Sequence, residues 1–394
     1  MATTDPGSAS APRTTAVTAS SRPLRYGRAI VRGLSPSSSQ PFIRLLRLTV
    51  VQTFHEHGLL SVVVLLHIGF AYLASRAGVT DILAYPLFSM KFTIGVAKLS
   101  IWIPLVSLLS ECWCGRRRGF AYAIKTWRIH YLNLRTLAGV VIGALLIAHA
   151  MIAHDTWKRM IGLATPYSWD ARLAAFDRTL HFGFDPWRIL HELLKPVALT
   201  AAIDTLYWLW FPLAATGISW MLWTRHRALR TRLLLAWSLT WLILGTVVAH
   251  FVASGGPFAY GHLATGPNPF QPLMDHLRYV DSIEPLVALQ LQGEVWANVV
   301  SGGDSQWYAM SAMPSLHVAV PVLYALGIGM KWRKLGAALW AFALLTLVGS
   351  IYLGWHYGVD GYVSVIGVVV IWRLVHFLLR SKPIPDGRFF SNLD

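Results

Sequence analysis

The feature that most constrains this chain is a series of eight long apolar stretches. They lie at residues 59–74, 93–110, 137–153, 197–223, 233–252, 315–330, 335–353 and 357–379. At about 1.5 Å per residue, each is compatible with a helix that crosses a hydrocarbon layer of about 30 Å. Because backbone N–H and C=O groups inside a membrane must be paired within the protein, such stretches fold as helices. The sequence therefore predicts an all-α polytopic membrane protein with about eight transmembrane helices.

The charge content supports this class and bears on the partners. Only 13% of the 394 residues are charged and 55% are hydrophobic, whereas about a quarter of a soluble domain is charged. The formal net charge of +16 would suggest nucleic-acid binding in a soluble chain. Here the basic residues form short clusters between apolar stretches, such as Arg116, Arg117 and Arg118. Membrane topology requires such clusters, so we expect no nucleic-acid partner.

The distribution of these clusters predicts the orientation of the chain. Basic residues are concentrated in the N-terminal region, in alternate connections at 111–136, 224–232 and 331–334, and after residue 379. The connection at 253–314 instead has Arg278 alone against five acidic residues. By the positive-inside rule, both termini are cytoplasmic and the connection at 253–314 lies on the extracytoplasmic face, or in the lumen of an organelle.

The two ends of the chain differ from its apolar part. Residues 1–40 are rich in Ser, Thr, Ala, Pro and Arg, which predicts a disordered basic cytoplasmic tail, with an organelle transit peptide as the alternative. Residues 41–57 have helical apolar spacing with Arg44 and Arg47, which predicts an interfacial helix. Residues 58–134 would hold two N-terminal transmembrane helices, and residues 381–394 a second cytoplasmic tail.

Two histidine motifs open two of the last apolar stretches. Asp360 follows His356 by four residues, so on a helix both side chains share one face, and the carboxylate can hold one imidazole nitrogen while the other reacts. In Pro314-Ser315-Leu316-His317, Ser315 is a favoured N-cap and His317 falls in the first turn, beside unpaired N–H groups that suit a phosphate. An isolated His-x-x-x-Asp is usually structural, but ionisable residues at the ends of membrane helices are usually functional. Eight spans place both histidines on one face, which indicates phosphoryl transfer.

These motifs resemble a known family. Pro314 to His317, followed by His356-x-x-x-Asp360, resembles the second and third signatures of the phosphatidic acid phosphatase type 2 superfamily. Gly256-Pro257-x-x-Tyr260 is similar to a variant in its lipid phosphotransferase branch, which includes the inositol phosphorylceramide synthases, and so are residues 170–187 and 204–207. The resemblance spans about residues 169–379 and implies a six-helix catalytic core at 135–380.

The resemblance also implies a role for each motif residue. His356 would attack phosphorus to form a phosphohistidine, and Asp360 would orient it. His317 would protonate the leaving alkoxide and later deprotonate the acceptor. This chemistry requires no metal or cofactor. The expected substrate-binding residues are Gly256, Pro257, Tyr260, Pro314, Ser315 and Ser350.

The sequence departs from the hydrolase branch where that branch binds phosphate. The hydrolase signature Lys-x6-Arg-Pro has Ala249 and Gly256 in place of its lysine and arginine, and the Ser-Arg pair of the third signature is Gly349-Ser350 here. Arginine best matches a dianionic phosphomonoester. A site without these arginines is better suited to a phosphodiester with one negative charge.

Three functions remain open at this point. The first is transfer of a phosphorylated headgroup, such as phosphoinositol, from a glycerophospholipid to a lipid alcohol such as ceramide; these two lipids would be the partners. The second is a lipid or prenyl phosphate phosphatase of the same superfamily. The third is a transporter or scaffold. A transport pathway would need a charged residue in the middle of a span, and no charged residue of the motif set lies there, which counts against this function. The long connections at 157–196 and 253–314 are expected to cover the site.

Overall fold

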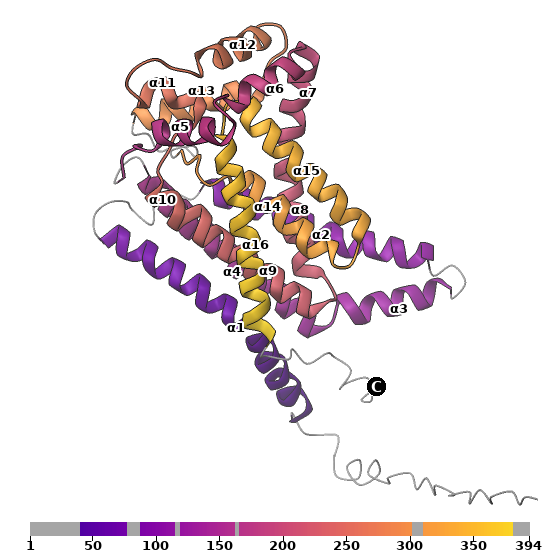
Figure 1. Cartoon of the computed structure of the whole chain (residues 1–394). Helices are drawn as coiled ribbons and strands as arrows, with labels where there is room; N and C mark the ends of the chain where they lie inside the picture. The colour runs from indigo at the N-terminus through magenta and orange to yellow at the C-terminus, as the bar shows by residue number, and fades with distance from the viewer. Residues whose placement is uncertain (1–39, 77–86, 115–118, 162–164, 302–309, 381–394) are drawn as a thin grey trace, which may run out of the picture. The chain divides into compact units, whose positions relative to one another are not determined.

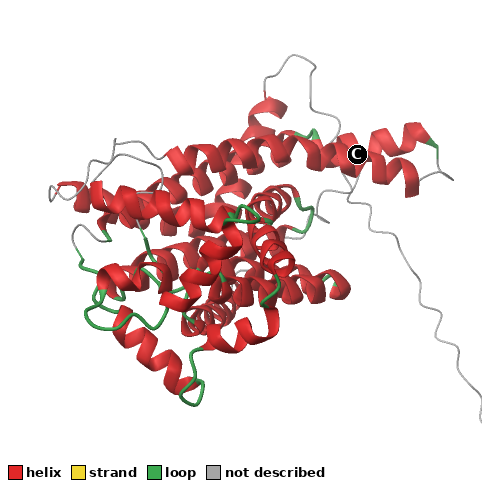
Figure 2. Cartoon of the chain, turned by 90° about the horizontal axis from the view of Figure 1, so that it is seen from above, coloured by secondary structure: helices red, strands yellow, loops and turns green. Residues whose placement is uncertain are grey.

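A computed structural model describes residues 40–76, 87–114, 119–161, 165–301 and 310–380. The tails predicted at 1–40 and 381–394 lie outside these residues, apart from residue 40. The described elements are all helices, as Figure 2 shows. The chain divides into two compact units, residues 1–48 and 49–394, and the site lies entirely in the second. The predicted all-α membrane class is confirmed, since seven helices within the described ranges are long and apolar enough to cross a membrane.

The first part of the chain forms three helices. They are α1 (Gln40–Arg76), α2 (Leu87–Cys114) and α3 (Phe120–Tyr131). Residues 41–57, predicted as an interfacial helix leading into the first span, are continuous with that span in α1. Helix α3 was not predicted; its Tyr131 hydroxyl donates to Ser107 of α2 at 2.8 Å, and its Trp127 donates to the carbonyl of Pro104 at 2.6 Å.

The other six predicted spans are also helical (Figure 1). They are α4 (Leu134–Met160), α7 (Val197–Trp208) with α8 (Trp210–Trp223), α9 (Arg227–Leu242) with a π-helical turn (Ile243–Val248) and α10 (Ala249–Phe251), α14 (Leu316–Gly329), α15 (Arg333–Tyr352) and α16 (Gly358–Arg380). Helix α14 has 14 residues. Its length is therefore about 21 Å, shorter than the hydrocarbon layer of about 30 Å, and it is the eighth apolar helix beside the seven of membrane length.

Small residues let the helices around α14 approach closely. A Cβ atom on Gly217 of α8 would lie 2.2 Å from the ring of Tyr324 in α14, whose hydroxyl donates to the carbonyl of Ala214 at 2.8 Å. A Cβ atom on Gly336 of α15 would lie 2.4 Å from the Cα of Gly329 in α14. Close approach through small residues is the usual basis of helix packing in membranes. Helix α14 is thereby enclosed by its neighbours, and its first turn is held at a defined position.

Six short helices gather at one end of the core (Figure 1). They are α5 (Asp170–Leu180), α6 (Pro186–Leu194), η2 (Pro257–Ala259), α11 (Tyr260–Leu263), α12 (Gln271–Asp281) and α13 (Val287–Ser301). The fully buried Leu273 and Leu277 of α12, and Leu286 just before α13, pack with Leu353 and Tyr357, which lie between α15 and α16. The short helices therefore form a second apolar core beside the start of α16, at the end of the protein that holds both motif histidines.

Candidate active site

A cavity of about 170 Å³ lies where the short helices meet the core, and both motif histidines line it. Its volume is close to the roughly 150 Å³ that accommodates one benzene molecule in a protein interior. The cavity therefore has room for a phosphoryl group and its adjoining atoms, but not for acyl chains. Its aromatic lining consists of Tyr207, Trp208, Trp210, Phe211, Trp241, Phe258 and Trp355.

Of the two long connections expected to cover the site, the one at 253–314 contributes residues of its short helices to the cavity lining. Phe258 of η2 and Leu291 and Val295 of α13 line the cavity. They are apolar, so this side of the cavity offers little to water.

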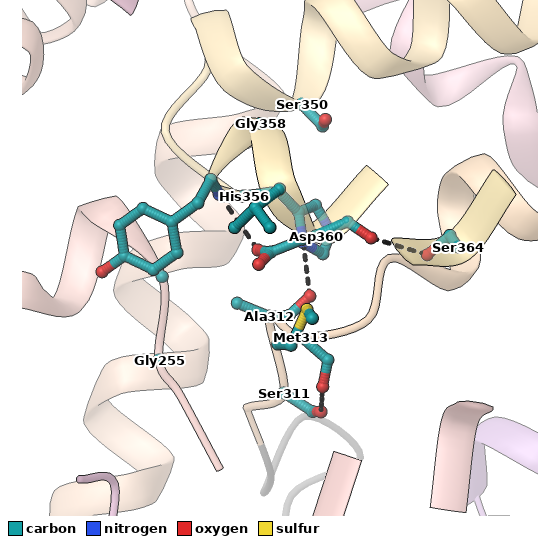
Figure 3. A network of polar contacts seen from close by, with 12 residues as sticks. Gly255, Ser311, Ala312, Met313, Ser350, His356, Gly358, Asp360 and Ser364 are labelled. Carbon is teal, nitrogen blue, oxygen red and sulfur yellow. Dashed lines mark hydrogen bonds and ion pairs between the residues drawn. The ribbon is translucent and has the colours of Figure 1, made fainter. Parts of the chain in front are cut away.

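His356 lies in the loop between α15 and α16, two residues before α16 begins at Gly358. Its Nδ1 is 2.7 Å from the carbonyl oxygen of Ala312 and 3.3 Å from Oδ2 of Asp360 (Figure 3). A carbonyl can only accept a hydrogen bond, so Nδ1 carries a proton, and in the neutral imidazole Nε2 is then the nitrogen with the free lone pair. The pairing of His356 with Asp360 is observed, but not on a shared helical face as the spacing suggested. Asp360 reaches back from the first turn of α16.

Asp360 is fully buried and connects the two motifs. Its Oδ2 also accepts from the backbone N–H of Tyr357 at 3.0 Å. Its backbone carbonyl accepts from the hydroxyl of Ser364 at 2.8 Å and from the N–H of Ser315 at 3.3 Å. The residue that contacts His356 is thus tied to the start of the helix that carries His317.

His317 is the second residue of α14 and is held by aromatic rings. It stacks on Tyr207 with a centroid distance of 5.0 Å and an interplanar angle of 15°, and its centroid is 4.4 Å from that of Trp210. The centroids of His317 and His356 are 6.3 Å apart. A phosphorus atom between the rings can lie about 3–3.5 Å from one nitrogen, while the leaving oxygen is within hydrogen-bonding reach of the other ring.

Three of the six expected substrate-binding residues lie at the cavity or next to its lining. Pro314 lines it, and Gly256 and Pro257 lie between two lining residues, Gly255 and Phe258. This loop approaches the cavity through its backbone.

The other three expected substrate-binding residues are not among those that line the cavity. Ser315 is fully buried, and its Oγ has no hydrogen-bond partner among the described residues. The hydroxyl of Ser350 donates to the carbonyl of Leu347 at 2.8 Å, while its own carbonyl accepts from the N–H of His356 at 3.1 Å. Tyr260 packs on Phe270 at a centroid distance of 5.3 Å.

The local geometry explains why arginine is missing from two positions of the hydrolase signatures. Gly256 has φ +89°, and a Cβ atom there would lie 2.4 Å from the carbonyl oxygen of Trp355. The side chain of Ser350 is inaccessible to solvent, so a guanidinium group could not be placed there without rearrangement. Both positions thus take small residues because the backbone and helix packing leave no room for arginine.

Asp170, at the start of α5, holds the two site loops together. It accepts hydrogen bonds from the N–H groups of Gly255 at 3.0 Å and Gly256 at 2.9 Å, and from the hydroxyl of Tyr357 at 2.8 Å. Burial raises the pKa of the Asp170 carboxyl, and these hydrogen bonds oppose the shift because they favour its ionised form. Asp170 therefore fixes the loop before Pro257 against the loop that carries His356.

Asp177 performs a related function about two helical turns further along α5. Its two carboxylate oxygens accept from the N–H groups of Gly358 and Val359, each at 2.9 Å. It thereby caps the start of α16, the helix that contains Asp360. The sequence analysis assigned no role to either aspartate. The available signal was their seven-residue spacing, which places them on one face of a helix.

The described residues bring together no group of three or more His, Cys, Asp or Glu side chains that could hold a metal ion.

Residues 171–374 match a family described as the PAP2 superfamily. The match covers more than half of the chain and includes His317, His356 and Asp360. No curated protein and no solved structure matches the chain.

Proposed function

We propose that this chain, which belongs to the PAP2 superfamily, transfers a phosphorylated headgroup from a glycerophospholipid to a lipid alcohol through a phosphohistidine. Membership of the superfamily makes it a lipid enzyme of the phosphatase or phosphotransferase type. The transfer reaction, the lipids and the residue roles are our proposal.

In the first proposed step, Nε2 of His356 attacks the phosphorus of the donor lipid. The bond from phosphorus to the diacylglycerol oxygen breaks, and protonated His317 gives that oxygen a proton. In the second step, neutral His317 takes a proton from the hydroxyl of the acceptor, whose oxygen attacks phosphorus. The P–N bond then breaks, so His356 and His317 return to their starting states.

The hydrogen bonds of His356 support its role as the nucleophile. Its Nδ1 proton is directed at Ala312 and Asp360, which leaves Nε2 unprotonated. As a phosphohistidine forms, positive charge develops on the imidazole, and the buried carboxylate of Asp360 stabilises that charge.

The observation that carries the choice of a phosphodiester donor is the absence of arginine among the described residues that line the cavity. A phosphomonoester brings two negative charges near neutral pH, and arginine forks are the groups that match it best. A phosphodiester brings one. Arginine does not fit at Gly256 or Ser350, which also favours a phosphodiester donor.

The composition of the cavity favours a lipid alcohol over water as the acceptor. Seven aromatic side chains and the apolar residues of α13 line it, so water competes poorly for the phosphohistidine. Ser311 also lines the cavity, and its hydroxyl can form hydrogen bonds to headgroup hydroxyls. Such a group suits phosphoinositol, and we propose ceramide as the acceptor on the resemblance to the inositol phosphorylceramide synthases.

We also propose that the site faces away from the cytoplasm. The connections at the opposite end of the core carry Arg225, Arg227, Lys331, Arg333 and Lys334. By the positive-inside rule that end is cytoplasmic, which places both termini inside and the short helices outside.

The test is a product ratio measured with purified protein in detergent. Labelled phosphatidylinositol, phosphatidylcholine and phosphatidic acid are each supplied with and without ceramide or diacylglycerol. We expect headgroup transfer from phosphatidylinositol that depends on the added alcohol, and little free phosphate from phosphatidic acid. Release of inorganic phosphate from phosphatidic acid well above any transfer from a diester would refute the proposal and favour the phosphatase alternative.

A further inference from the structure

The cavity contains one cationic side chain from outside the part of the chain that matches the family. Lys158 lies in the last turn of α4, before the matched residues 171–374. Among the described residues that line the cavity, it is the only lysine or arginine. Helix α4 therefore contributes a positive charge to a site whose motif positions have none.

The surroundings of Lys158 leave its ammonium group available to a ligand. The side chain is half-buried. Asp155, one turn earlier in α4, attracts it, but no carboxylate of the described residues forms an ion pair with it within 4.0 Å. His317 and His154 line the same cavity.

An ammonium group in this half-buried position loses favourable hydration free energy unless an anion binds to it. Removing a charge from water costs several kcal/mol as an order of magnitude, unless a partner compensates it. Charged side chains within membrane helices are accordingly rare and tend to mark ligand sites. In a cavity lined largely by aromatic and apolar side chains, the attraction between an ammonium and a phosphate is stronger than at a surface.

We propose that Lys158 binds the phosphate of the donor lipid and supplies the positive charge that the arginines of the hydrolase signatures supply elsewhere in the superfamily. This inference rests on the proposed function, since it places a phosphate between His317 and His356. An ammonium group is a single point charge with three donors, and it lacks the bidentate fork of a guanidinium. One lysine matches the single negative charge of a phosphodiester, so Lys158 contributes to the choice of substrate as well as to its affinity.

The test measures binding in the absence of turnover. The full chain with His356→Ala, which cannot form the phosphohistidine, is purified in detergent and titrated with glycerophosphoinositol, a soluble phosphodiester, and with glycerol 3-phosphate, a phosphomonoester. Quenching of tryptophan fluorescence reports binding, because four tryptophans line the cavity. Lys158→Met and Lys158→Arg are compared in this background. Lys195→Met is the matched control, since Lys195 is exposed and pairs with Glu192.

We expect Lys158→Met to weaken binding of glycerophosphoinositol by about tenfold or more, the effect of losing one charge-assisted hydrogen bond. Lys158→Arg should retain most of the affinity, and Lys195→Met all of it. Binding should weaken with added salt in the protein that keeps Lys158 and much less in Lys158→Met, a difference that a purely structural lysine would not produce. Thermal unfolding of each variant shows whether it is folded, and Lys158→Gln replaces Lys158→Met if the latter is not.

The outcomes separate this inference from the proposed function. If each ligand binds the Lys158→Met protein as tightly as the protein that keeps Lys158, the role of Lys158 is overturned, even if both proteins prefer the diester. Tighter binding of the monoester that still depends on Lys158 supports the role of Lys158 and contradicts transfer from a diester. No binding of either ligand to the folded Lys158 protein overturns the inference.

Discussion

Replacing Asp170 with asparagine should weaken both the protein and its activity, because one carboxylate connects two loops of the site. Oδ1 of Asp170 accepts from Gly256 and Tyr357, and Oδ2 accepts from Gly255. Asparagine has a single acceptor oxygen. In its best orientation that oxygen keeps the contacts to Gly256 and Tyr357, while the new NH₂ group meets the N–H of Gly255.

The magnitude follows from this count of hydrogen bonds. One buried N–H loses its partner and faces another donor, which costs about 1–3 kcal/mol in the free energy of unfolding. The displaced Gly255 lines the cavity, and its loop lies against the residue before His356. A displacement of about 1 Å at a reacting group can lower turnover by about a hundredfold, so we expect a loss of about tenfold to a hundredfold.

Two measurements check this prediction, thermal unfolding in detergent and the rate of headgroup transfer. Asp275→Asn is the matched control, because Asp275 is exposed on α12 and pairs only with Arg278 among the described charged residues. The control should have the stability and turnover of the unmodified protein, since exposed ion pairs contribute little. If Asp170→Asn behaved like Asp275→Asn in both assays, the reasoning that Asp170 fixes the site loops would be refuted.

Three further predictions concern the catalytic residues, the loop glycine and the effect of pH. His356→Ala and His317→Ala should each lower turnover at least about a thousandfold in a folded protein, whereas Asp360→Asn should retain measurable activity because the carbonyl of Ala312 still orients His356. Kinetics measure the turnover, and circular dichroism shows whether each variant is folded. Near-normal turnover of either alanine variant would contradict the assignment. Gly256→Arg should not create an arginine contact to phosphate and should lower the free energy of unfolding by about 2 kcal/mol or more. The reasons are the positive φ of Gly256 and the carbonyl oxygen of Trp355 close to its Cβ position. A stable variant with increased phosphatidic acid hydrolysis would disprove this. Burial lowers the pKa of His191 to about 4 from an ordinary 6.5. As the pH drops from about 6.5 towards 4, the unfolded chain binds a proton at this histidine and the folded chain does not, so the free energy of unfolding should fall. Thermal unfolding measured across this range should depend less on pH in His191→Phe.

The sequence by itself determined the class of fold and the main elements. All eight predicted spans are helical, because the length and apolar content of a stretch decide locally whether it can cross a membrane. It also proposed His317, His356 and Asp360 as site residues, and in the structure the two histidines line one cavity while Asp360 contacts His356. The presence of α3 was missed, because a short helix in a connection between spans lacks an equally strong signal.

Only the tertiary structure decided how the site is held. The nearest hydrogen-bond partner of the His356 ring is the carbonyl of Ala312, 44 residues away in the chain, and Asp170 reaches Tyr357 across 187 residues. Backbone acceptors and such distant contacts have no sequence pattern, since they depend on how the helices pack.

The same is true of the charge in the cavity. The motifs alone predicted a phosphate site without cations, because Gly256 and Ser350 occupy the positions where the hydrolase signatures have arginine. The structure brings Lys158 to the cavity from a helix that precedes the matched region, and it shows that a Cβ atom at Gly256 would collide with a neighbouring carbonyl. Sequence identifies which residues a site has along its motifs; packing decides which other side chains reach it and which substitutions it can accept.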